Sequence, residues 1–484
     1  MQLLPYRLAR QAGLAVVPGD AGWQLWLRED ADSAQLQELL RVQGRPASVC
    51  QLSRAAFDER LGGLYQAGEG AAEALIEGIG EQVDLDSLMS EMPRIEDLLE
   101  SDDEAPVIRL INGLFAQALQ RQASDIHIET FEQSLVVRLR VDGHLQEVLR
   151  PPRALSAMLV SRIKVMARLD IAEKRQPQDG RITLRAAGRE VDVRVSTLPG
   201  IHGERVVMRV LDKQASLLAL DNLGMPSAVA QGLRGCLARP NGIVLSTGPT
   251  GSGKTTTLYA CLNSLNDGSP NILTVEDPVE YAIAGIGQTA INPRAGLTFA
   301  SGLRAILRQD PDVIMLGEIR DRETAQIAVQ ASLTGHLVLS TLHTNSAVGA
   351  VTRLRDMGIE PFLIASCLRG VLAQRLVRRL CHCAERRPLQ PAEQALLPEL
   401  SDLQHSYHPR GCEQCRGTGY QGRLGLYEFV ELDAELIALL YDGASEVAMQ
   451  QYLQGRRQSL SGMAAASVAA GQTSLAEILR AVQG

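Results

Sequence analysis

A glycine-rich segment in the middle of the chain has the residues needed to bind a chain of phosphates. Residues 248–255 read GPTGSGKT, which satisfies the pattern G-x-x-x-x-G-K-[ST] at every fixed position. The glycines let the backbone curl so that several N–H groups point at one anion, and a following helix adds its positive dipole end. We expect Lys254 to reach the β- and γ-phosphates and the Thr255 hydroxyl to coordinate Mg²⁺. The predicted nucleotide-binding residues are Gly248, Pro249, Thr250, Gly251, Ser252, Gly253, Lys254, Thr255 and Thr256.

The elements around this segment are those that such a loop requires. The apolar run at 242–246 predicts a buried strand before it, and residues 255–262 predict a helix after it. Further apolar runs at 271–276, 312–317 and 337–341 alternate with helical patterns, which is typical of a parallel α/β sheet. The chemistry indicated is therefore the binding of a nucleoside triphosphate at the end of the first strand.

Two carboxylates follow two of the later strands. Glu276 lies in the segment VEDPVEY, and Glu318 lies in LGEIRD, where Gly317 stands in place of the aspartate that commonly supports Mg²⁺. Open α/β sheets bind their ligands at the carboxyl ends of the strands, so we expect both acids near the phosphates. One would orient or deprotonate the attacking water and the other would support the metal, and the sequence does not say which.

Two histidines flank the strand predicted at 337–341, in the segment TGHLVLSTLH. A histidine at a strand edge is more often structural than functional. Together with the motifs above, His336 and His343 are predicted to be γ-phosphate sensors or residues of a subunit contact.

Four of the eight cysteines form a cluster in the sequence. Cys381 and Cys383 enclose one residue, and Cys412 and Cys415 form a C-x-x-C knuckle. Four thiolates suit a tetrahedral, structural Zn²⁺, although the C-x-C half is tighter than usual. The alternatives are a degenerate knuckle without metal, or a ligand set in which a histidine replaces one thiolate; the candidates are His382, His405 and His408. The isolated cysteines, predicted to be buried and inert, are Cys50, Cys236, Cys261 and Cys367.

The composition is that of a soluble globular protein of several domains. The chain has 484 residues, of which 45% are hydrophobic, and its formal net charge is −8. The negative balance argues against non-specific binding of nucleic acid as the main activity. The sequence contains no run of about 20 apolar residues and no signal-peptide pattern at its start, so we expect a cytoplasmic protein.

The regions outside the core differ in character. Residues 1–85 predict a small unit of helical patches, such as 33–42 and 70–78, and the acidic run IEDLLESDD at 95–103 predicts a linker. An apolar stripe at helical spacing begins at Val107 and is followed by alternating strands and hairpins, which indicate an α+β domain. The tail is predicted to be helical, with Ser474 and Glu477 forming a capping box.

These motifs together resemble those of the secretion and pilus ATPase superfamily. The shared motifs, in this order, are the phosphate loop, the aspartate box VEDPVEY, the second nucleotide motif LGEIRD and the histidine box TGHLVLSTLH. SDIHIE and the segment from RQPQDGRITLR to GERVVMRVLDK are also similar, so the resemblance covers about residues 105–430. The opening LLPYRLARQAGL is similar to the N-terminal domain of type II secretion ATPases.

The resemblance implies an α/β fold with a RecA-like P-loop ATPase core and the following layout. It comprises an N-terminal docking domain (1–90), a linker (91–105), a PAS-like α+β domain (106–225), the core (226–380), a zinc subdomain (381–425) and a helical C-terminal subdomain (426–484). It also implies a homo-hexamer in which Arg194 and Arg209 help to complete a nucleotide site. The implied catalytic set is Glu276, Glu318, Lys254, His343, Arg194 and Arg209.

The function implied is that of an ATPase motor with ATP, Mg²⁺ and Zn²⁺ as cofactors. Its partners would be a bitopic inner-membrane platform protein, bound by the N-terminal domain, and a polytopic platform protein, with no nucleic acid. The main hypothesis is pseudopilus assembly and protein export by a type II secretion system. The alternatives are extension of a type IV pilus or competence pseudopilus, and, from other classes, a nucleotide-gated scaffold or a DNA-translocating ring.

Overall fold

A computed structural model gives the fold of the chain. It describes residues 12–19, 22–31, 36, 39–41, 45–53, 56–57 and 85, and from 105 to 482 all residues except 187–188, 213–218, 395, 397, 401–402 and 457–458. Residues 1–11, the predicted helical patch at 70–78 and all of the predicted linker at 91–105 except residue 105 lie outside this part. The chain divides into two compact units, Met1–Val141 with Leu145–Val210, and Asp142–His144 with Leu211–Gly484.

The N-terminal region contains a sheet in addition to the helical patches that the sequence predicts; the described residues of the patch at 33–42, which are 36 and 39–41, are helical. Strands β1 (Leu14–Gly19) and β2 (Gly22–Arg28) pair antiparallel, and β3 (Ser48–Leu52) pairs parallel to β2. Trp23 and Leu25 of β2 are buried, whereas Gln24 between them is exposed. This alternation buries one face of the strand, so the helical interpretation of this region is corrected to a mixed one.

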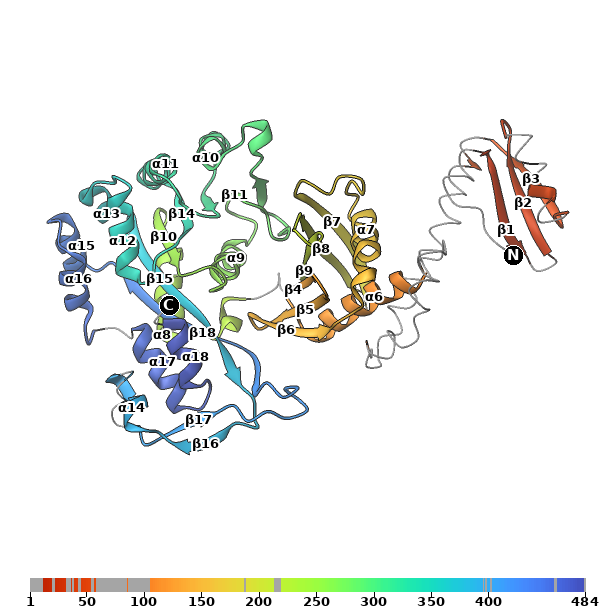
Figure 1. Ribbon diagram of the computed structural model, residues 1–484. Coiled ribbons are helices and arrows are strands. Elements are labelled where there is room, and N and C mark those ends of the chain that lie inside the picture. The colour runs from red at the N-terminus through yellow and green to blue at the C-terminus, as the bar shows by residue number, and fades with distance from the viewer. Residues whose placement is uncertain are drawn as a thin grey trace. The chain divides into compact units, whose positions relative to one another are not determined.

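The first unit also contains the α+β domain that the sequence predicts. Its six-stranded sheet has the order β6-β5-β4-β9-β8-β7, and two helices, α6 (Ala105–Gln120) and α7 (Ser156–Met166), belong to the same domain (Figure 1). The strands are β4 (Asp125–Thr130), β5 (Leu135–Val141), β6 (His144–Leu149), β7 (Gln178–Ala186), β8 (Arg189–Leu198) and β9 (Arg205–Asp212). The apolar residues of α6, such as Ile111 and Leu114, are fully buried against this sheet.

The second unit is built on a seven-stranded sheet with the order β12-β11-β13-β14-β10-β15-β18. The strands are β10 (Gly242–Thr247), β11 (Ile272–Glu276), β12 (Gly287–Ala290), β13 (Val313–Leu316), β14 (Leu337–Leu342), β15 (Leu368–Leu380) and β18 (Tyr420–Glu431). Neighbouring strands are parallel except β18, which is antiparallel to β15. The four strands predicted from the sequence are therefore present, and they lie next to one another in the sheet.

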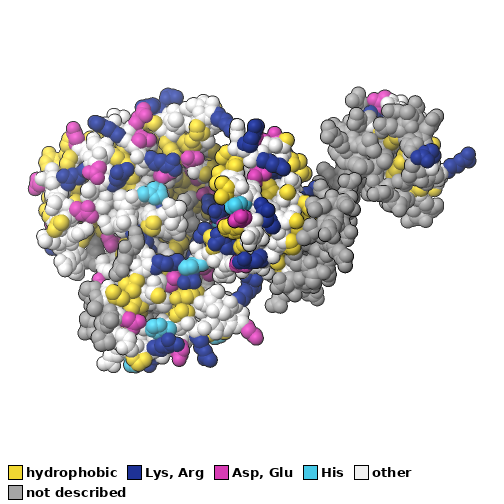
Figure 2. All heavy atoms as spheres, viewed as in Figure 1, with side chains coloured by type: hydrophobic (Ala, Val, Ile, Leu, Met, Phe, Trp, Pro, Cys, Tyr) yellow, Lys and Arg dark blue, Asp and Glu magenta, His cyan; other side chains and the backbone are white. Residues whose placement is uncertain are grey.

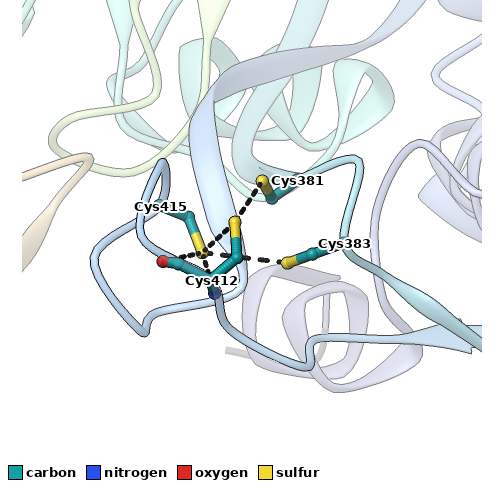
Figure 3. Close-up of side chains that lie close together, drawn as sticks. All are labelled: Cys381, Cys383, Cys412 and Cys415. Carbon is teal, nitrogen blue, oxygen red and sulfur yellow. Dashed lines mark hydrogen bonds between the residues drawn. The ribbon is translucent and has the colours of Figure 1, made fainter.

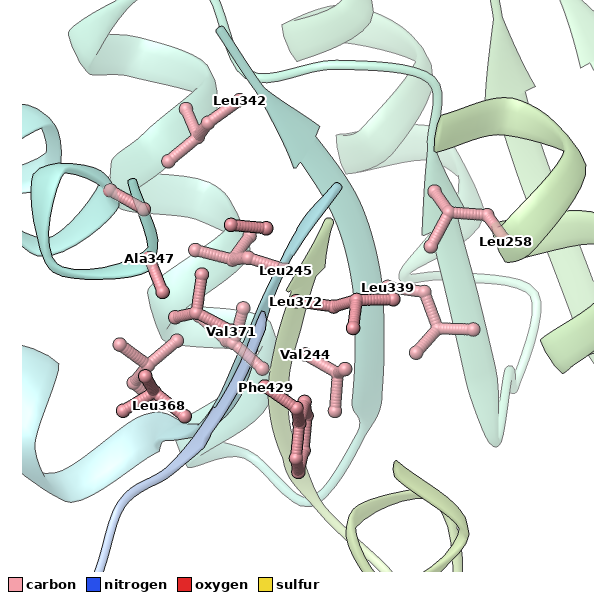
Figure 4. Packing of buried hydrophobic residues seen from close by; sticks show 14 of the residues in the cluster. Val244, Leu245, Leu258, Leu339, Leu342, Ala347, Leu368, Val371, Leu372 and Phe429 are labelled. Atoms are coloured by element: carbon pink, nitrogen blue, oxygen red, sulfur yellow. The ribbon is translucent and has the colours of Figure 1, made fainter. Parts of the chain in front are cut away.

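Helices cover this sheet and bury its central strands. They are α8 (Ser227–Leu237), α9 (Lys254–Leu265), α10 (Phe299–Ile306), α11 (Arg322–Leu333), α12 (Ala347–Asp356) and α13 (Pro361–Cys367). Every residue of β10 and β14 is buried. Figure 4 shows Val244, Leu245 and Leu339 packed among side chains of neighbouring elements. A parallel sheet covered on both faces requires such continuous apolar strands.

The C-terminal part of the second unit contains a small hairpin. β16 (Glu385–Pro388) pairs with β17 (His405–His408), next to the short helix α14 (Pro391–Gln394). The predicted helical tail is present as α15 (Ala434–Tyr441), α16 (Glu446–Leu453), α17 (Leu460–Ala469) and α18 (Leu475–Val482). Ser474 Oγ accepts the N–H of Glu477 at 3.3 Å, which is one half of the predicted capping box. The Glu477 carboxylate instead pairs with Arg378.

The surface is that of a folded domain with mixed charge. Acidic and basic side chains are interspersed over the described parts of both units (Figure 2). Among the described residues, every helix is too short or too polar to cross a bilayer.

Candidate nucleotide site and candidate metal centre

The phosphate loop connects the central strand β10 to the start of α9. Gly251 and Gly253 have φ values of +80° and +90°, a conformation that favours glycine because it has no Cβ. Gly253 is the last residue before α9, so the loop curls and then presents the N–H groups of the helix start. This is the anion-binding geometry predicted from the motif.

Lys254 lies inside this curl. Its Nζ donates to the carbonyl oxygens of Gly248 at 2.8 Å and Pro249 at 3.0 Å, and the residue is 8% exposed. Burial lowers the pKa of Lys254 to about 8, although the negative charge of Glu318 partly offsets this effect. Thr255 is exposed at the helix start, where its hydroxyl is accessible to a ligand. The ammonium group is thus held close to the loop by bonds that an anion can replace.

The two acids follow neighbouring strands, as the sequence predicts, because β11 pairs with β13. Glu276 is only 2% exposed and accepts three hydrogen bonds. Its donors are the Tyr259 hydroxyl, Thr274 Oγ1 at 2.6 Å and Gln288 Nε2 at 3.1 Å. These donors come from α9, β11 and β12, so this carboxylate is enclosed by protein on several sides.

Glu318 has a different environment at the same edge of the sheet. One carboxylate oxygen pairs with Arg320, and the other lies 3.3 Å from Nε2 of His343. The Glu318 side chain is 14% exposed, and those of His343 and Arg320 are 51% and 61% exposed. Its charge acts on Lys254, which places it within electrostatic range of the phosphate loop. The structure therefore brings Lys254, Glu318 and His343 together.

His336 does not join this group within one chain. It lies just before β14, whereas His343 lies just after it, at the end where the phosphate loop begins. A strand of six residues rises about 20 Å. His336 Nδ1 lies 2.8 Å from the carbonyl oxygen of Ala331, at the end of α11. Its predicted role as a γ-phosphate sensor or a residue of a subunit contact stays a prediction.

The four clustered cysteines converge on one point (Figure 3). Their sulfur atoms all lie within 4.8 Å of one another. The separations are 3.8 Å for Cys381–Cys412, 3.8 Å for Cys383–Cys415 and 3.7 Å for Cys412–Cys415. In a tetrahedral site with Zn–S bonds of about 2.3 Å, neighbouring sulfurs lie about 3.8 Å apart. The C-x-C half thus positions its two thiols as well as the C-x-x-C half does.

The surroundings of Cys415 also favour a thiolate. Burial opposes the charge, but the N–H groups of Cys412 and Gly419 both donate to Cys415 Sγ at 3.1 Å, and the pKa of Cys415 is lowered to about 6. Because four thiols already complete a tetrahedral ligand set, no histidine is needed as a ligand; the candidates were His382, His405 and His408. His408 Nε2 instead lies 3.0 Å from the Ser406 hydroxyl. The donor set fits a structural zinc ion.

Comparison with known proteins agrees with this geometry. Residues 100–480 match the family described as Type II/IV secretion system protein, and residues 3–65 match the N-terminal domain of GSPII protein E. The chain belongs to the type II/IV secretion system family. The match covers both the α+β domain and the nucleotide site, and members of this family are secretion ATPases.

Relatives of the same length exist in several bacteria. The chain is 52% identical over 479 residues to a type II secretion system protein E from Aeromonas hydrophila, covering 99% of this chain and 96% of that one. It is 56% identical over 448 residues to a type II secretion system ATPase E from Vibrio cholerae, covering 92% and 89%.

Solved structures show the same fold. The ATPase DotB of Legionella pneumophila has a TM-score of 0.58 at 22% identity, covering 76% of this chain and 94% of that one. The pilus retraction motor PilT with bound ADP has a TM-score of 0.53 at 23% identity, covering 76% and 95%. The RecA-like architecture predicted for this family member is confirmed.

The two arginines implied by the family resemblance lie in the first unit. Arg209 of β9 donates from Nε to Asp125 Oδ1 at 2.9 Å, and its side chain is 59% exposed. Arg194 of β8 pairs in register with Arg181 of β7. A role for these arginines at a nucleotide stays a prediction.

Three residues of the site were not found from the sequence. Tyr259 and Gln288 hold Glu276, and Gln374 of β15 contacts the phosphate loop. Each lies in an ordinary helix or strand pattern, and its partners are distant in the sequence. Only the spatial neighbourhood of strands β10, β11, β12 and β15 reveals them.

Proposed function

We propose that this secretion ATPase hydrolyses ATP to ADP and phosphate in order to drive pseudopilus assembly and protein export by a type II secretion system. The main support for ATP hydrolysis is that the phosphate loop, Lys254 and Glu318 converge at one edge of the sheet. The relatives named as type II secretion proteins support type II secretion as the process that this ATPase drives, since they match this chain over nearly all of its length.

The surroundings of the two acids support different roles. Glu318 faces His343 and the loop with part of its surface open, so we assign it the orientation and deprotonation of the attacking water. Nε2 of His343 lies 3.3 Å from this carboxylate, where a protonated imidazole would pair with it. Glu276 is assigned the support of Mg²⁺. Mg²⁺, held by Thr255 and the phosphates, would neutralise charge on the β- and γ-oxygens.

The loop binds and orients the phosphates through its own groups. The N–H groups of the loop and of the first turn of α9 replace water around the phosphate oxygens. Lys254 exchanges its bonds to the carbonyl oxygens of Gly248 and Pro249 for bonds to the phosphates. Its burial means that this charge acts in a poorly solvated site, where it is worth more than in water.

The assembly belongs to the same proposal. A homo-hexamer would place Arg194 and Arg209 at the nucleotide of a neighbouring subunit, where a guanidinium stabilises charge in the transition state.

The N-terminal domain, whose residues 3–65 match that of GSPII protein E, would dock on a bitopic inner-membrane protein. The chain would then work in the cytoplasm and reach the membrane through its partners. The domain boundaries at 90, 105, 225, 380 and 425 are part of this proposal.

We also propose that the cysteine cluster holds one structural Zn²⁺. Its support is the set of sulfur separations and the N–H groups that donate to Cys415. Metal analysis of the purified chain should find about one zinc per chain, and substitution of Cys412 by serine should abolish its retention. A well-folded chain that contains no zinc would contradict this proposal.

The test of the catalytic proposal is Lys254→Ala in the full chain. We expect ATP turnover to be lost, because the phosphates lose their only buried cation within the described part of the loop, while the fold is kept. Lys174→Ala is the matched control, since Lys174 is exposed in the first unit. Turnover and circular dichroism are measured on both variants. Hydrolysis retained by Lys254→Ala would overturn the proposal.

A further inference from the structure

Strand β15 runs past the phosphate loop and carries a buried glutamine at the point of closest approach. In the register of the sheet, Thr247 at the end of β10 pairs with Ala373 of β15, so Gln374 is the next residue along. Gln374 is only 2% exposed. A buried amide must satisfy both its donor and its acceptor, and the partners of this one all surround the phosphate loop.

The amide of Gln374 connects three segments of the nucleotide site. Its Nε2 donates to the carbonyl oxygen of Ser252 in the loop at 2.7 Å. Its Oε1 accepts from Thr257 Oγ1 of α9 at 2.9 Å and from Ser246 Oγ of β10 at 3.3 Å. One planar group thus links the strand before the loop, the loop itself and the helix after it.

Close packing against Gln374 also accounts for two glycines of the motif. A Cβ on Gly248 would lie 2.5 Å from the backbone oxygen of Gln374, and a Cβ on Gly253 would lie 3.1 Å from its Nε2. The loop therefore follows the surface of this residue at both of its ends. The curl of the backbone depends on this contact as well as on the conformational freedom of glycine.

The next residue on β15 extends the same connection. Arg375 is 4% exposed, and its Nη2 donates to the carbonyl oxygen of Asn345 at 2.9 Å, two residues after His343. Its Nε donates to the carbonyl oxygen of Ala481 in α18 at 3.1 Å. β15 thus joins the phosphate loop to the histidine segment and to the C-terminal helix.

We propose that Gln374 is a positioning residue for ATP binding, which holds the phosphate loop in its anion-binding curl before the nucleotide arrives. The inference rests on the proposed function, because it names a residue that prepares the same site. An amide is needed at this position because the Ser252 carbonyl requires a donor and the two hydroxyls require an acceptor. A preformed loop spends less binding energy on ordering its backbone.

The test compares two substitutions of similar size. Gln374→Met removes the donor and the acceptor, whereas Gln374→Glu keeps the acceptor and loses the donor to Ser252 at neutral pH. We expect each to raise the dissociation constant for ATP about tenfold, because the loop is then less ordered before ATP binds and part of the binding energy goes into ordering it. The matched control is Gln394→Glu, which removes a similar 2.8 Å bond from Nε2 to the carbonyl oxygen of Leu403, away from the loop.

A pH series separates positioning from general damage to the fold. When the introduced carboxyl group of Gln374→Glu is protonated, its O–H can donate to the Ser252 carbonyl. ATP affinity of this variant, divided by that of the wild type at the same pH, should therefore recover as the pH falls. Gln374→Met should show no recovery. Equal affinity of both variants and the wild type, or a loss that does not depend on pH in Gln374→Glu, would overturn the inference.

Two further measurements distinguish a failure of the positioning role of Gln374 from a failure of the proposed ATPase function. If the wild type binds ATP and Lys254→Ala does not, while Gln374→Met binds normally, the function stands and the positioning role is overturned. If neither Gln374 variant folds, Thr257→Val tests the same contact, because it removes only the hydroxyl that donates to Oε1. We expect it to weaken ATP binding about threefold, and unchanged affinity would contradict the role of Gln374.

Discussion

The ends of strands β11 and β13 lie side by side in the sheet and each carries a glutamate, yet the two surroundings have little in common. Glu276 is 2% exposed and is bonded to Tyr259, Thr274 and Gln288. Glu318 is partly open and contacts Arg320 and His343, whose side chains are more than half exposed. One carboxylate is fixed within the core, and the other is free to meet a ligand.

The difference shows how two carboxylates at one edge of a sheet can have different roles. A carboxylate that accepts three hydrogen bonds is held in one orientation, which suits a group that supports a metal ion without moving. A carboxylate with an exposed neighbour can exchange partners during a reaction, which suits a group that receives a proton. The following predictions can break or sharpen this contrast.

The largest expected effect is that of Glu318→Gln. The amide cannot take a proton from water, so we expect turnover to fall by about 10²–10³-fold while ATP still binds. Steady-state hydrolysis and ATP binding are measured on the full chain. Glu323→Gln is the matched control, because Glu323 is 59% exposed and pairs with Arg304 on the surface. Full turnover in Glu318→Gln would mean that Glu318 does not deprotonate the attacking water, which contradicts the role assigned to it.

Glu276→Gln should act chiefly on the fold. The new amide group would turn a donor toward Tyr259 or Thr274, which both donate now, and so leave a buried hydroxyl unsatisfied. We expect the unfolding free energy of the second unit to fall by about 2 kcal/mol. Denaturant unfolding followed by circular dichroism measures this loss. If stability is unchanged, the three donors around Glu276 do not stabilise the fold, and this prediction is wrong.

The sequence was sufficient for the parts of this site that are contiguous. The phosphate loop could be predicted because its glycines and Lys254 lie within eight residues, and the α/β pattern placed Glu276 and Glu318 on strands of one sheet. The surroundings of the two acids could not be predicted, because Tyr259 and Gln288 are conspicuous only after the sheet is assembled. The N-terminal strands were missed because short strands carry a weak pattern: in β2 only Gln24 interrupts the apolar run from Trp23 to Leu27.

A smaller effect is expected from Tyr259→Phe. The substitution removes the hydroxyl that donates to Glu276 and accepts the N–H of Glu280 at 3.2 Å, but it keeps the edge-on ring contact with Tyr281 at 4.6 Å. We expect the second unit to lose about 1 kcal/mol of stability, less than in Glu276→Gln. Tyr281→Phe is the control, because it leaves the bond to Glu276 in place. An equal loss in both variants would mean that the enclosure of Glu276 contributes nothing specific.

The smallest effect is a shift in pH dependence that distinguishes the two acids through Lys254. Burial lowers the pKa of Lys254 from 10.5 to about 8, and Glu318 opposes this change. Since the phosphates require the charged ammonium, the dissociation constant for ATP should rise about tenfold from pH 7 to pH 9.

The same rise in pH that weakens ATP binding should increase the stability of the chain without ATP. Between pH 8 and 10.5 the unfolded chain holds more protons than the folded one, so stability rises with pH.

Glu318→Gln removes the charge that supports the ammonium form, so the midpoint of the binding curve should move to lower pH. Glu276→Gln should leave the midpoint in place, because Glu276 is not among the groups that shift the pKa of Lys254. The measurement is ATP affinity against pH for the wild type and both variants. Equal shifts in the two variants would mean that both carboxylates act on the phosphate loop, and the separation of their tasks would then rest on hydrogen bonding alone.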